Sequence, residues 1–463
     1  MKPPRIIISL ITVVVLAGSC KKDGDGEYYP TDSIGKINKW MLDSMRQFYY
    51  WNDAIPKSPN YSLQPEAFYK SLLYKDDRFS AIVNTLDPAP PNSSFYRFGF
   101  HFAFVQVAGY ANYIGVITFV MPFSPAAALG LQRGTCFLQV DGQPVTAQNV
   151  AATLERMQSS ALSLQLTLAT QENNTWTPGN TVSINTGLFG ENPIYYTRSF
   201  TAVGKKTGYL FYNYFHETFD ADLMTAIDKL KRAGVSELIL DLRYNLGGSV
   251  ASSAKLAAMI ADKLGRNSVY AIYEGNRRLG RRGRTLQEVL QTSGSNAGKN
   301  YDDLQSVSLH LGRVFILTTK ATASAAELII NNLRPYLEVI QIGETTTGKD
   351  EASFLITDLR NPKQVAWELH PIVYKLFNSN NQGGYNQGLA PAYQVSELAT
   401  LPLSPVGQAS DPLIHQALEL IYGSNIPGAP TDLRQRRFAA PCTPIFNSAA
   451  TLARSMPPAS VQY

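Results

Sequence analysis

Two residues of this sequence are suited to covalent chemistry, Ser324 and Lys349, which stand 25 positions apart. Ser324 lies between an apolar run, Val314 to Thr318, and a helical pattern that extends to Tyr336. A lone serine before a helix is usually only its N-cap. Lys349 follows the next apolar run, Val339 to Ile342, so one helix and one strand can return the chain beside its start. The two side chains can then meet, and burial can lower the pKa of a lysine enough for it to take a serine's proton.

A glycine pair, Gly247 and Gly248, is the third candidate feature. It follows the apolar strand Leu238 to Leu242 and precedes a helical pattern, Ala251 to Leu264. Glycines at such a place let backbone N–H groups approach a ligand, as an oxyanion hole requires. A plain strand-to-helix turn would look the same. A phosphate loop is disfavoured because no Gly-Lys-Ser or Gly-Lys-Thr follows.

Alternating strands and helices from about 207 to 401 must position these loops. The pattern predicts a sheet with crossover helices, which is an α/β architecture. The predicted strands are Tyr209 to Tyr212, Leu238 to Leu242, Val314 to Thr318 and Val339 to Ile342, and the predicted helices are Asp220 to Gly234, Ala251 to Leu264 and Ser324 to Tyr336.

The first part of the chain, residues 31–87, predicts a small helical domain. Apolar residues recur at steps of three and four from Ile34 to Phe48, and a second helix is expected from Pro65 to Tyr74. The aromatic run Tyr49, Tyr50 and Trp51 could stack on sugars, but aromatics at helical spacing more often belong to a core.

Residues 95–170 are expected to be mostly β, with one helix, Asn149 to Met157. The predicted strands are Phe98 to Val107, Gly115 to Val120, Cys136 to Val140 and Leu162 to Ala169. The run from Ser124 to Gly134, together with Val140 to Val145, resembles the core of a PDZ domain, although Thr135 stands where that family usually has Asp. The resemblance implies an extended peptide ligand, with Phe98, Gly99 and Phe100 as the carboxylate loop.

The loops that contain the glycine pair, Ser324 and Lys349 follow one another in this order. Their order and the serine-to-lysine interval resemble those of the carboxyl-terminal processing (tail-specific) serine peptidases of family S41. The resemblance implies an α/β, crotonase- or ClpP-like peptidase core at 200–423, preceded by the PDZ domain and an N-terminal helical cap. It implies that Ser324 is the nucleophile and Lys349 the general base, and that the amides of Ala325 and Gly248, or Gly247, form the oxyanion hole.

The same resemblance assigns supporting roles and shows two departures. Glu327 and Thr346 would help to hold the catalytic residues in position. Ser353 stands where many members carry Gln to orient the lysine, and Ala392 where the family usually has Asp. A hydroxyl can replace that Gln as a hydrogen-bond acceptor. The alternative is a catalytically silent, PDZ-containing peptide-binding lipoprotein that kept the fold.

The N-terminus predicts export. Lys2 and Arg5 precede a short apolar stretch, Ile6 to Ala17, and Leu16 to Cys20 resembles a bacterial lipobox. We therefore expect a signal peptide at 1–19, a lipid anchor on Cys20, a flexible tether at 20–30, and a place in the cell envelope at the outer membrane.

Composition narrows the partners further. The 463 residues are 44% hydrophobic, and 41 Lys and Arg against 36 Asp and Glu is too small a surplus to predict a nucleic-acid partner. The resemblance to the S41 peptidases implies polypeptide substrates. No HExxH or close CxxC pattern occurs, so no metal or other cofactor is expected.

The arginine-rich run from Arg277 to Arg284 is interpreted as a solvated loop, with binding to anions as the alternative. Residues 424–463 are expected to be a loosely ordered tail. The sequence leaves the oligomeric state open.

Overall fold

The computed structural model describes residues 33–86, 93–159, 161–172, 175–428, 440–457 and 459–461. The predicted signal peptide, the tether and Cys20 lie outside these residues. Within the described ranges, no helix is both long and apolar enough to cross a membrane.

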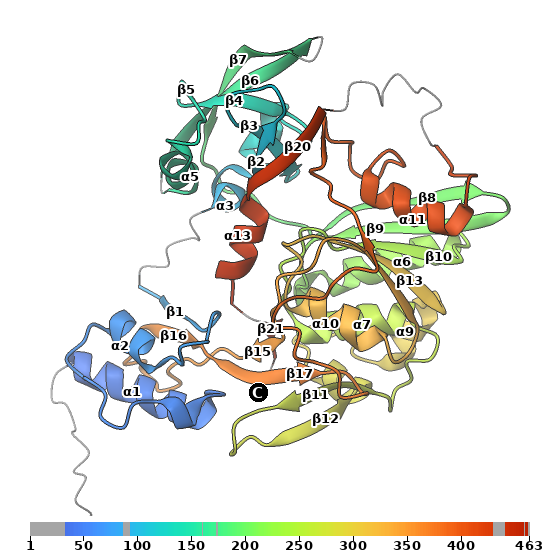
Figure 1. Cartoon of the computed structure of the whole chain (residues 1–463). Helices are drawn as coiled ribbons and strands as arrows, with labels where there is room; N and C mark the ends of the chain where they lie inside the picture. Colours follow the sequence, from blue (N-terminus) through green and yellow to red (C-terminus); the bar gives the residue numbers. More distant parts are fainter. Residues whose placement is uncertain are drawn as a thin grey trace, which may run out of the picture.

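The central sheet is mixed and six-stranded, in the order β18-β14-β13-β10-β9-β8. Figure 1 shows β8, β9, β10 and β13 beside one another. Strands β9, β10, β13 and β14 are parallel, and β8 pairs antiparallel with β9. This confirms the predicted α/β architecture. The bounds are β8 (Ile194–Ala202), β9 (Lys205–Tyr212), β10 (Glu237–Asp241), β13 (Arg313–Thr318), β14 (Glu338–Gly343) and β18 (Tyr393–Gln394).

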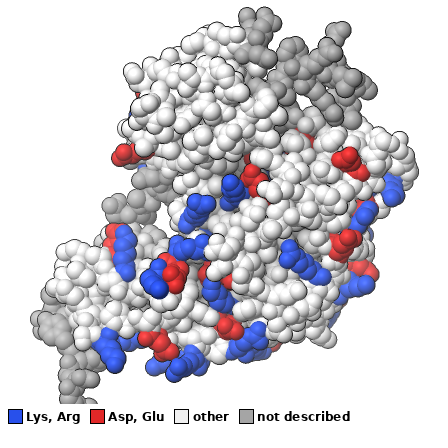
Figure 2. All heavy atoms as spheres, in the orientation of Figure 1, with Lys and Arg blue, Asp and Glu red and all other residues white. Residues whose placement is uncertain are grey.

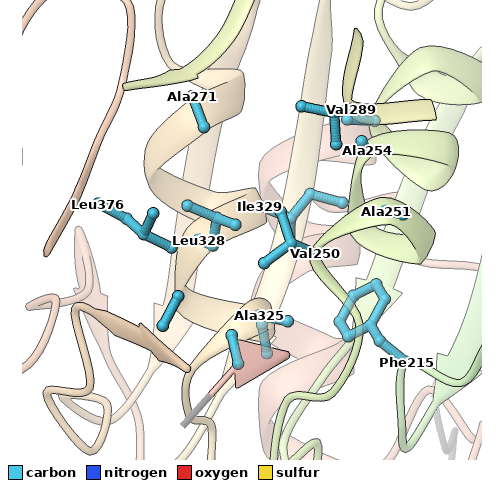
Figure 3. Close-up of a cluster of buried hydrophobic side chains, with 14 of the residues drawn as sticks. Phe215, Val250, Ala251, Ala254, Ala271, Val289, Ala325, Leu328, Ile329 and Leu376 are labelled. Atoms are coloured by element: carbon cyan, nitrogen blue, oxygen red, sulfur yellow. The ribbon is translucent and has the colours of Figure 1, made fainter. Parts of the chain in front are cut away.

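Helices cover both faces of this sheet because its central strands are apolar on both sides. Leu240 and Ile316 face one hydrophobic cluster, whereas Ile239 and Phe315 face another. The first cluster packs against α7 (Val250–Ile260) and α10 (Ala325–Leu333), whose apolar side chains meet in Figure 3. The second includes side chains of α11 (Pro412–Tyr422). Helix α6 (Asp220–Arg232) lies between β9 and β10 in the chain, as predicted.

A second sheet has the order β12-β11-β17-β15-β21. Its strands are β11 (Val269–Glu274), β12 (Arg281–Thr285), β15 (Glu351–Ser353), β17 (Ile372–Phe377) and β21 (Ala459–Ser460). The arginine-rich run was expected to be a loop, but part of it is strand β12, paired antiparallel with β11. The pairing places Arg281 2.9 Å from Glu274, and the Arg284 guanidinium lies over the Tyr273 ring. Figure 2 shows basic and acidic side chains interspersed over this lower part of the molecule.

The N-terminal helices form where the sequence predicts them, as α1 (Ser33–Phe48) and α2 (Pro65–Leu72). Tyr49 is fully buried in the cluster that also contains the α7 side chains, so this region shares a core with the central sheet. A short strand that the sequence did not indicate, β1 (Ala81–Asn84), pairs with β16 (Trp367–His370) and ties the region to the rest of the chain.

The predicted β-rich region belongs to an eight-stranded sheet, ordered β19-β20-β2-β3-β4-β6-β7 with β5 paired to β4. The predicted strand at Phe98 begins instead at Phe100, because Phe98 ends a short helix, α3 (Ser94–Phe98). The helix α5 (Val150–Gln158) agrees with the prediction. The other bounds are β2 (Phe100–Val107), β3 (Ile114–Val120), β4 (Cys136–Val140), β5 (Gln143–Pro144), β6 (Ser163–Glu172), β7 (Thr175–Asn185) and β19 (Thr400–Leu401).

The expectation of a loosely ordered tail is wrong for residues 440–457 and 459–461, which we call the C-terminal segment. It forms β20 (Ala440–Asn447), helix α13 (Ser448–Ser455) and β21. Figure 1 shows α13 between the eight-stranded sheet and the central sheet. The segment is ordered by tertiary contacts: Leu452 and Ala453 are buried in the cluster that contains Phe95. Residues 429–439 lie outside the described residues.

Candidate active site

Ser324 stands between β13 and α10, at the N-cap position of that helix. Its backbone has φ of 59° and ψ of −118°, a conformation that is unusual for any residue with a side chain. Hydrogen bonds of the two preceding residues hold the chain in this conformation. The Thr322 hydroxyl donates to the Leu242 carbonyl at 2.9 Å, and the Ala323 amide donates to the Asn245 carbonyl at 3.0 Å. The Ser324 side chain is buried, and its Oγ has no hydrogen-bond partner among the described residues.

The glycine pair lies directly against this serine. A Cβ added to Gly247 would lie 2.6 Å from the Ser324 Cβ, and one added to Gly248 would lie 2.0 Å from the Phe215 carbonyl oxygen. Both glycines have positive φ values, so only glycine fits at either position. In the described part of the chain, the amides of Gly248 and Ala325 donate none of the hydrogen bonds that the structure shows. Two unused amides beside a serine are what an oxyanion hole requires.

Glu327 connects Ser324 to Lys349. Its Oε2 accepts hydrogen bonds from the backbone amides of both residues, each at 2.8 Å. Its Oε1 accepts from the Gly348 amide at 2.7 Å and from the Thr346 hydroxyl at 2.5 Å. Two nitrogens that bond one oxygen must be close neighbours, so the structure brings together the serine and lysine segments that the sequence singled out.

The Lys349 amine is almost completely buried, with 1% of the residue exposed. Burial lowers its pKa from 10.5 to about 7; Arg78 adds to this effect, and Glu327 and Glu351 oppose it. Nζ lies 4.4 Å from the centroid of the Phe79 ring. An amine with a pKa near neutrality has a large neutral fraction at physiological pH and can therefore accept a proton.

The hydrogen bonds of this amine run to the C-terminal segment. Nζ donates to the carbonyl oxygens of Met456 at 2.6 Å, Ala453 at 2.9 Å and Pro457 at 3.5 Å. Ser353, proposed from the sequence as an acceptor for Lys349, is not among these partners. It is a buried residue of β15, and its carbonyl accepts from the Val461 amide at 2.9 Å.

The predicted carboxylate loop lies at the end of α3. The Gly99 amide donates to the carbonyls of Phe95 at 2.9 Å and Ser94 at 3.1 Å, so this N–H is already used within the helix cap. The assignment of Phe98, Gly99 and Phe100 to carboxylate binding therefore stays a prediction. Among the described residues, no group of three or more His, Cys, Asp or Glu side chains could hold a metal ion.

The sequence did not indicate a buried ion cluster behind the glycine loop. The Arg243 guanidinium contacts Asp241 at 2.8 Å, Asp411 at 2.7 Å and Glu397 at 3.2 Å. Arg133, from the turn before β4, contacts Glu397 at 2.8 Å and so links this turn to the ion cluster at the end of β10. The Asp-Leu-Arg spacing of Asp241 and Arg243 was a weak local signal, but nothing local marks the other three.

Comparison with known proteins agrees with this architecture. Residues 206–395 match the sequence profile of peptidase family S41, and residues 36–81 match that of the peptidase S41 N-terminal domain. The chain belongs to peptidase family S41.

Relatives of known name are similar over half of the chain. A carboxyl-terminal-processing protease of Picosynechococcus is 26% identical over 232 residues, 50% of this chain and 49% of that protein. The carboxy-terminal processing protease CtpA of Bacillus subtilis is 26% identical over 240 residues, 51% of this chain and 45% of that protein. This chain thus spans about half the length of these relatives.

A crystal structure from Bacteroides fragilis that is assigned to the S41 proteases superimposes with a TM-score of 0.68. Its sequence is 29% identical, and the match covers 86% of this chain and 98% of that one. The S41 fold thus extends well beyond the matched sequence profiles.

Proposed function

We propose that this protein is a serine endopeptidase in which Ser324 is the nucleophile and Lys349 the general base. One observation carries the proposal: the backbone amides of both residues bond the same Glu327 oxygen, and the lysine amine is buried with its pKa lowered to about 7. A surface lysine would be protonated and could not take a proton at neutral pH.

The proposed reaction has two halves. The Ser324 Oγ attacks the scissile carbonyl carbon while its proton passes to Nζ of Lys349, and the amides of Gly248 and Ala325 stabilise the oxyanion. The lysine then gives that proton to the departing amine, which leaves an acyl-enzyme. Water hydrolyses this ester by the same steps, with Lys349 again as the base.

The substrates we propose are exported polypeptides with unstructured or C-terminal segments. The region at 95–170 would act as a PDZ domain that holds an extended chain at the edge of β2, which follows the predicted carboxylate loop. A lipid anchor on Cys20 would hold the enzyme in the cell envelope at the outer membrane, close to such substrates.

The test compares cleavage of a denatured reporter protein by the wild type and by Ser324→Ala and Lys349→Ala. Each variant should lose at least about 1000-fold in kcat/KM, because each lacks a partner in the proton transfer. Lys320→Ala is the matched control: it removes an exposed lysine from the loop before Ser324 and should leave the rate unchanged. Equal rates for the wild type, Ser324→Ala and Lys349→Ala would refute the proposal and favour the catalytically silent peptide-binding protein.

A further inference from the structure

The C-terminal segment contacts the edge of β2, the Lys349 amine and the glycine loop, three places that the proposed function assigns to substrate binding or catalysis. We infer that it is a tethered competitor of substrate: it occupies the surfaces that a polypeptide substrate needs, and substrate binds by displacing it. The inference rests on the proposed function, because it assigns those surfaces to substrate.

The first contact is at the edge of β2. Strand β20 pairs antiparallel with β2 over a register from Ala103 opposite Asn447 to Val107 opposite Cys442. The Phe446 ring lies 5.5 Å from Phe102 and packs against the cluster that contains side chains of α5. A strand added to a sheet edge, with a side chain on the neighbouring cluster, is the usual way of binding an extended peptide. The segment therefore fills the place proposed for substrate.

The second contact is at the lysine. All three carbonyl acceptors of Nζ belong to the C-terminal segment, and three acceptors can take every hydrogen of an ammonium group. The Ser324 Oγ, by contrast, has no partner among the described residues. With the segment in place, the amine is bonded to backbone oxygens instead of to the serine, an arrangement that does not support proton transfer.

The third contact is beside the glycine loop. Strand β21 pairs in parallel with β15, with Ala459 opposite Ala352 and Ser460 opposite Ser353. The Ser460 amide donates to the Gly248 carbonyl at 3.0 Å. A scissile carbonyl that reaches the Gly248 amide must bring its own backbone along this loop. The segment and a substrate therefore cannot both lie there.

Helix α13 anchors the segment between these contacts and provides a matched pair of substitutions. Leu452 is 4% exposed and buried in the cluster with Phe95, whereas the adjacent Thr451 is exposed. Leu452→Asp buries a charge in that cluster and should release the segment. Thr451→Asp adds the same charge on the solvent face and should leave the segment docked.

The binding experiment uses the full chain carrying Ser324→Ala, so that its outcome does not depend on catalysis. The probe is a fluorescein-labelled synthetic peptide of residues 440–461. Leu452→Asp should bind it at least about tenfold more tightly than the parent or Thr451→Asp, because apparent affinity scales with the fraction of molecules whose site is open. Hydrogen exchange of residues 440–461 should be faster in Leu452→Asp, while β10 and β13 stay protected.

If hydrogen exchange shows that Leu452→Asp also loses protection in β10 and β13, the binding experiment is done with Ala459→Asp instead. Ala459 is a buried residue of β21 and lies outside helix α13. Equal probe affinity in the parent, the opened variant and Thr451→Asp would overturn the inference. Cleavage assays with Ser324 restored separate the two proposals. A reporter cut equally fast with and without Leu452→Asp refutes the inference alone, whereas tighter probe binding without any cleavage refutes the proposed peptidase alone.

Discussion

Glu327→Gln tests the geometry of the site most directly. The substitution keeps the shape of the side chain but replaces one carboxylate oxygen with an NH₂ group, which donates. Each oxygen now accepts two hydrogen bonds, Oε2 from the amides of Ser324 and Lys349, and Oε1 from the Gly348 amide and the Thr346 hydroxyl. In either orientation of the glutamine, its NH₂ group must face two donors.

The less costly orientation turns the NH₂ group toward Thr346, whose hydroxyl can rotate and accept. The Gly348 amide then loses its acceptor in a buried place, which costs about 1–3 kcal/mol. The bonds that persist lose their charge, at about 1 kcal/mol each. Removing a carboxylate whose pKa is raised by complete burial offsets part of the loss. We expect the free energy of unfolding to fall by about 2–4 kcal/mol.

Urea denaturation and peptide cleavage measure the two consequences. Cleavage should fall by about 100-fold in kcat, because a small misplacement of the serine relative to the lysine has an effect of that size. Glu338→Gln is the control: it is an exposed carboxylate at the start of β14 and should change stability by less than about 0.5 kcal/mol. If Glu327→Gln is as stable and as active as the wild type, the shared carboxylate does not hold the site, and the reasoning fails.

Three further substitutions have expected outcomes. The free energy of unfolding of Ser324→Gly, measured in urea titrations, should exceed that of Ser324→Ala by up to about 1 kcal/mol, because glycine relieves the strained backbone. A lower value for Ser324→Gly would contradict strain at this residue. For Lys349→Met, the free energy of unfolding of the wild type minus that of the variant should rise by about 1.4 kcal/mol per pH unit from about pH 7 to 10.5. In this pH range Lys349 holds its proton in the unfolded chain but not in the folded protein. A difference that does not change with pH would mean that the pKa is not shifted. Arg133→Met should cost about 3–5 kcal/mol in the same titrations, because buried Glu397 and Asp411 lose one of their two guanidinium partners. Arg156→Met, at a partly exposed ion pair, should cost about 1 kcal/mol or less, and equal costs would be inconsistent with a buried cluster.

The central fold was predictable because its signals are local. The two middle strands, β10 and β13, are short runs that are apolar on both faces, and each is followed by a helical pattern. Parallel strands joined by helices bring the loops after their carboxyl ends to one edge of the sheet. The loops of Gly247, Ser324 and Lys349 had to meet there, whatever the details of the intervening chain.

The ion cluster and the exact partners of Lys349 were not predictable in this way. Glu397 and Asp411 meet Arg243 across more than 150 residues of sequence, and no periodic pattern marks such a pair. Ser353 was assigned to the lysine on a family spacing alone. In the structure the amine instead donates to backbone carbonyls. Every residue has such a carbonyl, so no residue type in the sequence indicates this partner.

The C-terminal segment was misread for the same physical reason, and its place in the fold limits how substrate selection can work. Its strands form on the edges of β2 and β15, which exist only once the other sheets have folded. If a substrate displaces β20 and β21, it makes the backbone hydrogen bonds that they give up, so backbone pairing contributes little to selection. Selection must then come from side chains, foremost the one that replaces Phe446 against Phe102 and Phe104. A substrate with an aromatic residue there should compete best, and one with a charged residue should leave the segment docked.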